Sequence, residues 1–128
     1  MQANRILVQE AVSGTVINAY VSAVTFNSSP IPIHKVYGIS FQVSNPSTGT
    51  PAGTWSVQTC NDWEGNETMT PNANLVNWTT VSGLNVAISG AGGGFLELFS
   101  AARWVRLVYT AGSGSITATA TCHIKSMQ

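Results

Sequence analysis

The stretch ITATATCHI, residues 116–124, alternates small apolar residues with polar ones more strictly than almost any other part of the chain. Such period-two alternation predicts a β-strand with one buried face. The other face carries threonine hydroxyls and an imidazole, which suit either solvent or contact with another subunit. The apolar face comprises Ile116, Ala118, Ala120, Cys122 and Ile124, and the polar face comprises Thr117, Thr119, Thr121 and His123.

The small side chains of the apolar face need bulky partners if the core is to reach the packing density of native proteins. Other segments of the chain supply large apolar residues with the same alternating pattern. We therefore expect bulky side chains of other segments to fill the space opposite the small ones of residues 116–124. The expected partners are Tyr37, Phe41, Trp55, Leu107 and Tyr109.

The rest of the chain also predicts strands. No window keeps a helical apolar period over three turns, whereas short alternating segments recur between clusters of Gly, Pro, Asn and Ser. The loop AGSG (111–114) predicts a hairpin between the last two strands. We expect an all-β protein, an antiparallel β-sandwich or jelly roll of about eight strands. It forms one domain over residues 1–128, with residues 1–14 as a candidate N-terminal arm.

Charged residues make up only 8% of the chain, with five basic and five acidic side chains. In a typical soluble domain, charged residues make up about 25% of the chain. A small monomer with so few charges has weak protection against association. Two interpretations follow: a subunit whose surface is largely covered in an assembly, or an extracellular β-domain with a neutral, hydroxyl-rich coat.

Several classes of protein are disfavoured by the same composition. Five dispersed basic residues give no patch for nucleic acid. The N-terminal sequence does not resemble a signal peptide, and no apolar run approaches the ~20 residues that span a membrane. We expect a chain made in the cytoplasm, without cofactor or metal.

The two cysteines are expected to be buried thiols, with a disulfide as the alternative. No nucleophile, phosphate-loop or metal-ligand pattern indicates an enzyme.

Arg103 and Arg106 lie in an otherwise apolar candidate strand of this charge-poor chain. A buried, unpaired cation is strongly destabilising, so both side chains need partners. Glu97, in the preceding candidate strand, is the nearest carboxylate in chain order. We expect a fork-shaped bond to Glu97 or to backbone carbonyls that ties sheets or subunits together, with anion binding as the alternative.

Trp63 lies within a long polar segment, residues 61–76, and Trp78 follows that segment. Exposed tryptophans in a β-sandwich can stack on sugars, whereas buried ones supply core or interface area. Packing is the simpler interpretation. Glycan stacking on Trp63 or Trp78 is the alternative.

Four segments together resemble small virion proteins of tailed bacteriophages. The final segment is the most specific, because it carries an Arg-x-x-Arg-Leu-Val-Tyr-Thr strand and a Gly-Ser loop. The chain departs from the pattern at Cys60, where Ser is more usual, and at Trp104, where Tyr is more usual. The segments are VYGISFQV (36–43), GTWSVQTCNDW (53–63), NWTTVSGLNVAISG (77–90) and AARWVRLVYTAGSGSITATATCHIKS (101–126).

The resemblance implies a non-enzymatic structural protein of a phage particle. It is expected to be a capsid decoration or cement protein made in the host cytoplasm, contacting the major capsid protein and copies of itself. The alternative is a tail or fibre module that binds host glycans. The expected contact residues are Ile6, Pro30, Ile31, Pro32, Ile33, Trp63, Arg103 and Arg106.

Overall fold

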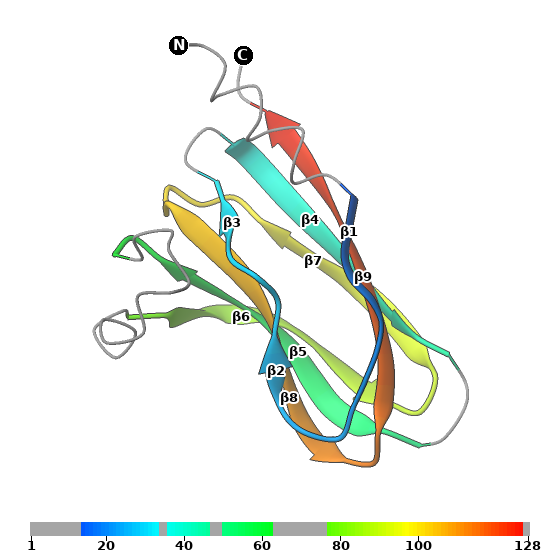
Figure 1. Ribbon diagram of the computed structural model, residues 1–128. Coiled ribbons are helices and arrows are strands. Elements are labelled where there is room, and N and C mark those ends of the chain that lie inside the picture. The colour runs from blue at the N-terminus through cyan, green and yellow to red at the C-terminus, as the bar shows by residue number, and fades with distance from the viewer. Residues whose placement is uncertain (1–13, 34–35, 47–49, 63–76, 127–128) are drawn as a thin grey trace.

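The structure is a computed structural model that describes residues 14–33, 36–46, 50–62 and 77–126. Two antiparallel sheets pack face to face, so the prediction of an all-β sandwich is confirmed (Figure 1). The described strands are β1 (Gly14–Ser22), β2 (Phe26–Asn27), β3 (Ile31–Pro32), β4 (Val36–Asn45), β5 (Ala52–Cys60), β6 (Thr79–Ser89), β7 (Gly92–Leu98), β8 (Trp104–Ser113) and β9 (Ile116–Ser126).

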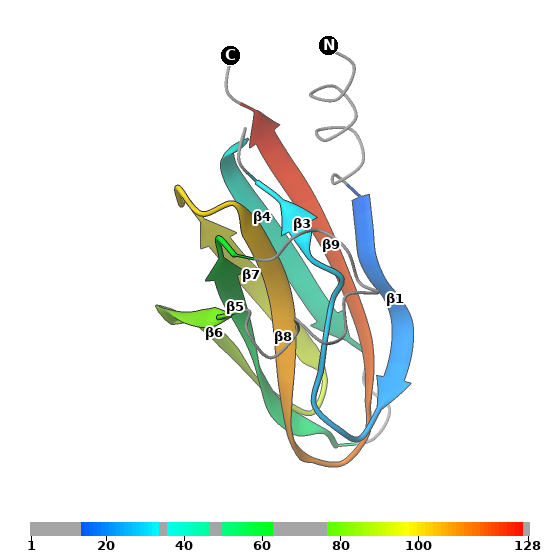
Figure 2. The ribbon, with the colours of Figure 1, turned by 60° about the vertical axis from the view of Figure 1, so that its left-hand side comes forward.

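Sheet I has the strand order β1-β9-β4-β7, and sheet II has the order β2-β8-β5-β6, with β3 also paired to β8. The turned view shows the two sheets as separate layers (Figure 2). β2 and β3 are two short pieces along the same side of β8, so they act as one interrupted edge strand. Every strand pair is antiparallel.

The core forms between the alternating faces that the sequence predicts. In β9, Ala118 and Ala120 are fully buried, and Trp55 and Leu107 of sheet II are fully buried as well. Tyr109 is 1% exposed. The small side chains of β9 are thus combined with bulky ones of sheet II, and the predicted partner Phe41 is buried in β4, the neighbour of β9 within sheet I.

The predicted partner Tyr37 is wrong: its side chain is 56% exposed. The pairing of β4 with β9 shifts register between Val36 and Gly38. A bulge of this kind inserts an extra residue and reverses the facing of the side chains beyond it. Residues from Ile39 onward keep the predicted facing, and Tyr37 turns outward.

The predicted hairpin at residues 111–114 is also wrong. β8 pairs with β5 and β9 pairs with β4, so the connection crosses from sheet II to sheet I. Gly114 adopts a φ of 70° in this connection, a conformation that favours glycine. Gly114 therefore serves a turn between the two sheets, which local sequence does not distinguish from a hairpin turn.

Ser28 explains why the edge strand beside β8 is interrupted. Its hydroxyl accepts a hydrogen bond from the Leu107 backbone N–H at 2.9 Å and donates one to the Ser29 carbonyl at 3.2 Å. The Ser28 N–H donates to the Leu107 carbonyl at 2.8 Å. Ser28 is only 5% exposed, so water does not readily replace this contact. Its hydroxyl therefore satisfies the Leu107 N–H, a backbone donor that neither β2 nor β3 pairs.

Replacing Ser28 with alanine is expected to lower the free energy of unfolding by about 1–3 kcal/mol, because the buried Leu107 N–H then has no acceptor. Urea denaturation measures the change. Ser29→Ala is the matched control, since Ser29 is exposed and contributes only its backbone carbonyl to this network. Equal effects of the two substitutions would contradict this role for the Ser28 hydroxyl.

Candidate functional site

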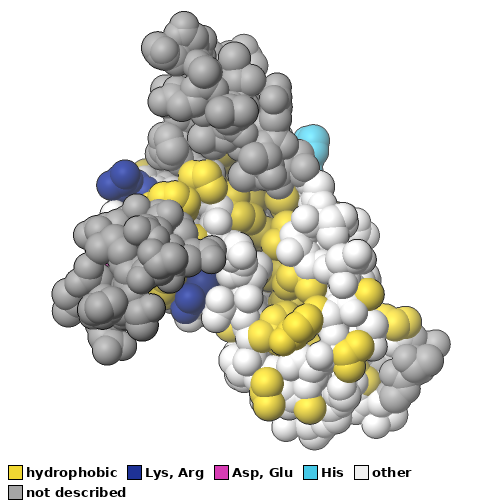
Figure 3. Space-filling model, viewed as in Figure 1, with side chains coloured by type: hydrophobic (Ala, Val, Ile, Leu, Met, Phe, Trp, Pro, Cys, Tyr) yellow, Lys and Arg dark blue, Asp and Glu magenta, His cyan; other side chains and the backbone are white. Residues whose placement is uncertain are grey.

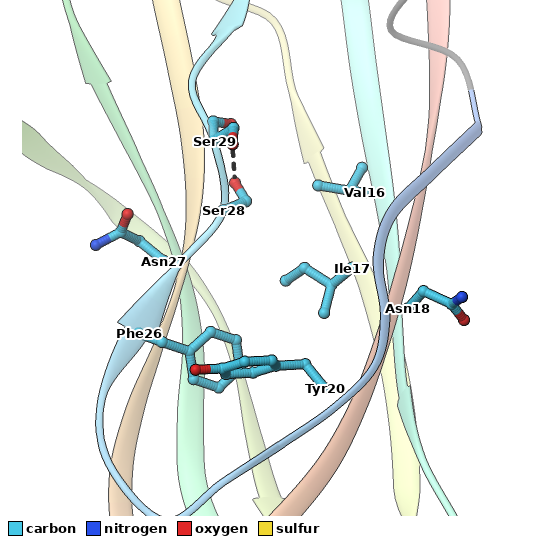
Figure 4. Close-up of a pocket in the computed structure, with 8 residues that line it drawn as sticks. All are labelled: Val16, Ile17, Asn18, Tyr20, Phe26, Asn27, Ser28 and Ser29. Carbon is cyan, nitrogen blue, oxygen red and sulfur yellow. Dashed lines mark hydrogen bonds between the residues drawn. The ribbon is translucent and has the colours of Figure 1, made fainter. Parts of the chain in front are cut away.

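A groove lies between β1, at the edge of sheet I, and the β2 segment, at the edge of sheet II. Its volume is about 370 Å³. Figure 4 shows Val16, Ile17 and Tyr20 pointing toward β2, with Phe26 opposite Tyr20. The space-filling view shows hydrophobic side chains along this hollow (Figure 3). The remaining lining residues are Asn18, Asn27, Ser28 and Ser29.

The sandwich is open here because its two edge strands do not pair with each other. Among the described residues, β1 ends sheet I and β2 ends sheet II, so each of these strands has a described ladder partner on only one side. The pairing of β1 with β9 is irregular, with register shifts around Ile17. Ala19 has a φ of 51°, and its N–H donates to the Thr119 hydroxyl at 3.2 Å. These irregularities let both Val16 and Ile17 line the groove.

An aromatic cluster closes one end of the groove. The ring of Phe26 lies 4.7 Å from Tyr20, 5.8 Å from Trp55 and 5.6 Å from Tyr109, measured between ring centroids. Such edge-to-face and tilted contacts stabilise an aromatic group beyond its area burial. This end is therefore a preformed apolar wall, and Tyr20, 48% exposed, is the ring that solvent reaches.

Burial raises the pKa of Tyr109 above its ordinary 10.0 and that of Cys122 above its ordinary 9.0, with a backbone hydrogen bond from Gly14 opposing the second shift. In both cases the folded protein holds the proton more tightly than the unfolded chain does. The stabilisation is complete below about pH 9 and is lost as pH rises through the raised values. We expect the urea midpoint to fall between pH 9 and pH 11, and to fall less steeply in Tyr109→Phe. An unchanged midpoint across this range would contradict the burial of both groups.

The outer face of sheet II holds a second cluster, around Arg106. Its guanidinium carbon lies 4.4 Å from the centroid of the Trp78 ring, and its Nε donates to the Gln58 side-chain oxygen at 2.8 Å. Gln58 in turn donates to the Thr80 hydroxyl at 3.3 Å. Partial burial lowers the pKa of Arg106, and Cys60 opposes that shift.

The predicted bond between these arginines and Glu97 is not found in the described part of the chain. Glu97 lies exposed in β7 of sheet I and is paired in register with Ser40, whereas Arg106 lies in β8 of sheet II. Glu97 and Arg106 lie in strands that follow one another along the chain, but these strands belong to different sheets. Arg103 is exposed, and its backbone N–H donates to the Asn61 side-chain oxygen at 2.8 Å.

A double-mutant cycle on Trp78→Leu and Arg106→Met should give a coupling free energy of about 1 kcal/mol, because the cation lies over the ring at a half-buried site. Denaturant unfolding of the four proteins measures it. Val24→Ser with Trp78→Leu is the control cycle and should show coupling near zero, because Val24 is an exposed residue between β1 and β2 and has no part in this network. Additive effects of Trp78→Leu and Arg106→Met would contradict the stacking.

The outer face of sheet I is uncharged over most of its area. Thr119 and Thr121 of β9 stand in register with Ser44 and Gln42 of β4. At one end, the rings of Tyr37 and Phe99 pack 5.6 Å apart, and both are mostly exposed. We call this surface the hydroxyl face. Its aromatic side chains are Tyr37, Phe95 and Phe99, and its charged ones are Glu97 and Lys125.

Sequence reasoning missed the Tyr37–Phe99 pair. Gly38 is the signal that could have indicated it, because a Cβ at this position would lie only 2.8 Å from Cδ1 of the Phe99 ring. The glycine therefore leaves room for an exposed aromatic ring. Lys125 adds a cation 5.7 Å from the centroid of Tyr37.

The predicted contact residues fall into three groups. Ile6 and Trp63 lie outside the described residues. Ile31 and Ile33 are 7% and 3% exposed and belong to the core, so their side chains offer little surface to a partner. The third group consists of residues that are partly or fully exposed: Pro30, Pro32, Arg103, Arg106 and the alternative glycan residue Trp78.

Cys60 and Cys122 are buried thiols in different sheets, not joined in a disulfide. Within the described ranges, no group of three or more His, Cys, Asp or Glu side chains could hold a metal ion. The same residues include no helix long and apolar enough to cross a membrane.

Comparison with known proteins adds no relative: a scan against protein-family models finds no match, and a search of curated proteins gives no significant similarity.

Proposed function

We propose that this protein is a non-enzymatic structural component of a bacteriophage particle, acting as a capsid decoration or cement protein. The observation that carries the proposal is the hydroxyl face, a broad strand surface that pairs neutral Ser, Thr and Gln side chains with exposed aromatic ones. Aromatic groups enriched on a surface poor in charge are typical of the central part of protein interfaces. Phe95 and Phe99 are 61% and 66% exposed.

The strand order gives a second, weaker argument. If β2 and β3 count as one strand, the described residues form eight strands, which the two sheets take in the orders 1-8-3-6 and 2-7-4-5. We infer that this is a jelly roll, the double-sheet architecture found in viral capsid and lectin domains. Because one fold serves many functions, this argument is an analogy and depends on the hydroxyl face for its weight. It agrees with the resemblance to small virion proteins of tailed phages.

In this role the protein acts mechanically. The hydroxyl face docks on the major capsid protein across a junction between capsomers, with copies of the protein alongside one another. Buried contact area then raises the free energy needed to separate the capsomers under the pressure of packaged DNA. No covalent bond is made or broken, and the rigid sandwich carries mechanical force between the capsomers on either side of the junction.

The test uses empty shells assembled with and without the purified protein. Wild-type protein should bind the shells and raise their rupture temperature. The variants Phe95→Ser and Phe99→Ser should weaken binding at least tenfold, since exposed aromatic groups at the centre of an interface carry much of its affinity. Val24→Ser is the matched control, because Val24 is 67% exposed but lies outside the hydroxyl face. Equal rupture temperatures with and without protein would overturn cementing.

Glycan binding by a tail or fibre module is the second candidate, and the Trp78 site gives it less support. One face of the Trp78 ring is covered by the Arg106 guanidinium, which leaves less aromatic surface for a sugar. Imaging of intact particles with a labelled antibody separates the two candidates by location. A label confined to the tail, together with a glycan-array signal that disappears in Trp78→Ala, would replace the first proposal with the second.

A further inference from the structure

The groove between β1 and β2 has the features of a site for an extended peptide strand. Within the part of the chain that the structure describes, both bordering strands are sheet edges, so backbone N–H and C=O groups of each point away from its own sheet. Between them lie apolar side chains, with Tyr20 half exposed beside Phe26. An added strand would satisfy backbone groups at an edge and cover this apolar surface, the combination used in β-augmentation.

A segment of the same chain lies within reach of the groove. Thirteen residues precede Gly14, the first residue of β1, and the groove begins at Val16. If the chain reverses over residues 11–14, residues 5–10 stand opposite residues 15–20, the part of β1 that lines the groove. Six extended residues cover about 20 Å. Gly14 has a φ of 134°, which favours glycine, and a Ser-Gly pair is a turn signal.

The chemistry of this segment fits an apolar groove. Residues 5–10 read Arg-Ile-Leu-Val-Gln-Glu, and their pattern predicts a short strand. In a strand Ile6 and Val8 point to one side and Leu7 to the other. Ile6 and Val8 can therefore enter the groove together, while the charged ends of the segment stay in solvent.

We propose that residues 5–10 occupy the groove of their own chain as an added strand beside β1, closing the open side of the sandwich. The same chain is the favoured source because a short tether gives an effective concentration in the millimolar range, above that of a second copy in dilute solution. Docking in this way shields an edge that would otherwise pair with other chains. This inference does not depend on a role in a phage particle.

Hydrogen–deuterium exchange of the full-length protein, followed by mass spectrometry, tests the proposal. Amides of residues 5–10 should exchange at least tenfold more slowly than in an unstructured peptide. The double variant Ile6→Asp/Val8→Asp should remove this protection, whereas Leu7→Asp should keep most of it. On the groove side, Tyr20→Asp should remove it and Val21→Asp should not, because Val21 lies next in β1 but does not line the groove. Circular dichroism verifies that every variant remains folded.

Three results would overturn the proposal. The first is exchange of residues 5–10 at the rate of an unstructured peptide in the wild-type protein. The second is equal loss of protection in Leu7→Asp and in Ile6→Asp/Val8→Asp, which would exclude a strand with one face in the groove. The third is protection that rises with protein concentration, which would identify the occupant as the segment of a second copy.

Discussion

Replacing Gly53 with valine is expected to lower the free energy of unfolding by about 3 kcal/mol. Gly53 lies in β5 between β6 and β8, and the phenol ring of Tyr109 extends across it. A Cβ at this position would lie 2.5 Å from the Tyr109 Cζ and 2.7 Å from the Thr110 carbonyl oxygen. Neither neighbour can yield without moving buried structure, so the substitution strains the core and the β5–β8 ladder together.

Urea denaturation at neutral pH measures this loss, with the midpoint and the slope fitted separately. Thr54→Val is the matched control: it introduces a valine at the adjacent position, where the side chain is only half buried, and should change stability by less than about 0.5 kcal/mol. Gly53→Val with an unchanged midpoint would contradict the placement of the Tyr109 ring.

The Tyr109 hydroxyl gives this prediction a second test. The hydroxyl is buried and has no hydrogen-bond partner among the described residues, so Tyr109→Phe should leave stability unchanged or raise it slightly. Tyr109→Phe should also relieve part of the strain in Gly53→Ala, since it removes one of the atoms that the new Cβ meets. The Thr110 carbonyl remains, so the rescue is partial, and a double-mutant cycle measures it.

The fold class was predictable because alternation is a local property. Residues 116–124 bury one face over a whole strand, residues 54–57 do so over part of β5, and Trp55 and Ala118 take the predicted orientations. Pairing between strands is a property of the whole fold. Only Gly114 and Ser115 join β8 to β9, yet the two strands lie in different sheets, because β5 and β4 offer ladders over most of their lengths.

The candidate surfaces were harder to predict for the same reason. Tyr37 keeps its place in the alternating pattern, and a one-residue bulge still moves it from the expected core to the surface. The groove depends on two edge strands failing to meet, which no single stretch of sequence encodes. Arg106 did need partners, as predicted, but the partners lie in the neighbouring strand and beside it, at Gln58 and Trp78, and not at Glu97.

Trp55→Ala is the substitution with the largest expected effect, a loss of about 3–5 kcal/mol. Trp55 is fully buried, and its ring lies 5.1 Å from Tyr109 and 5.8 Å from Phe26, so alanine leaves a cavity where three aromatic rings now meet. Trp55→Phe should lose much less than its reduced size implies. The indole Nε1 is buried without a hydrogen-bond partner among the described residues, and phenylalanine removes that unsatisfied donor along with part of the ring.

Thermal and urea unfolding of the two variants, with Phe99→Ala as the exposed aromatic control, separate packing from polarity at this site. Phe99 is 66% exposed and, among the described residues, packs on Tyr37 and Gly38, so its loss should lower the free energy of unfolding by about 1 kcal/mol at most. If Trp55→Phe were nearly as damaging as Trp55→Ala, the Nε1 would have to make a stabilising hydrogen bond. If both were mild, the small side chains of β9 would have to be packed against something other than this ring. A close-packed aromatic core opposite Ala118 and Ala120 requires a free energy of unfolding that is much lower in Trp55→Ala than in Trp55→Phe, and close to the wild-type value in Phe99→Ala.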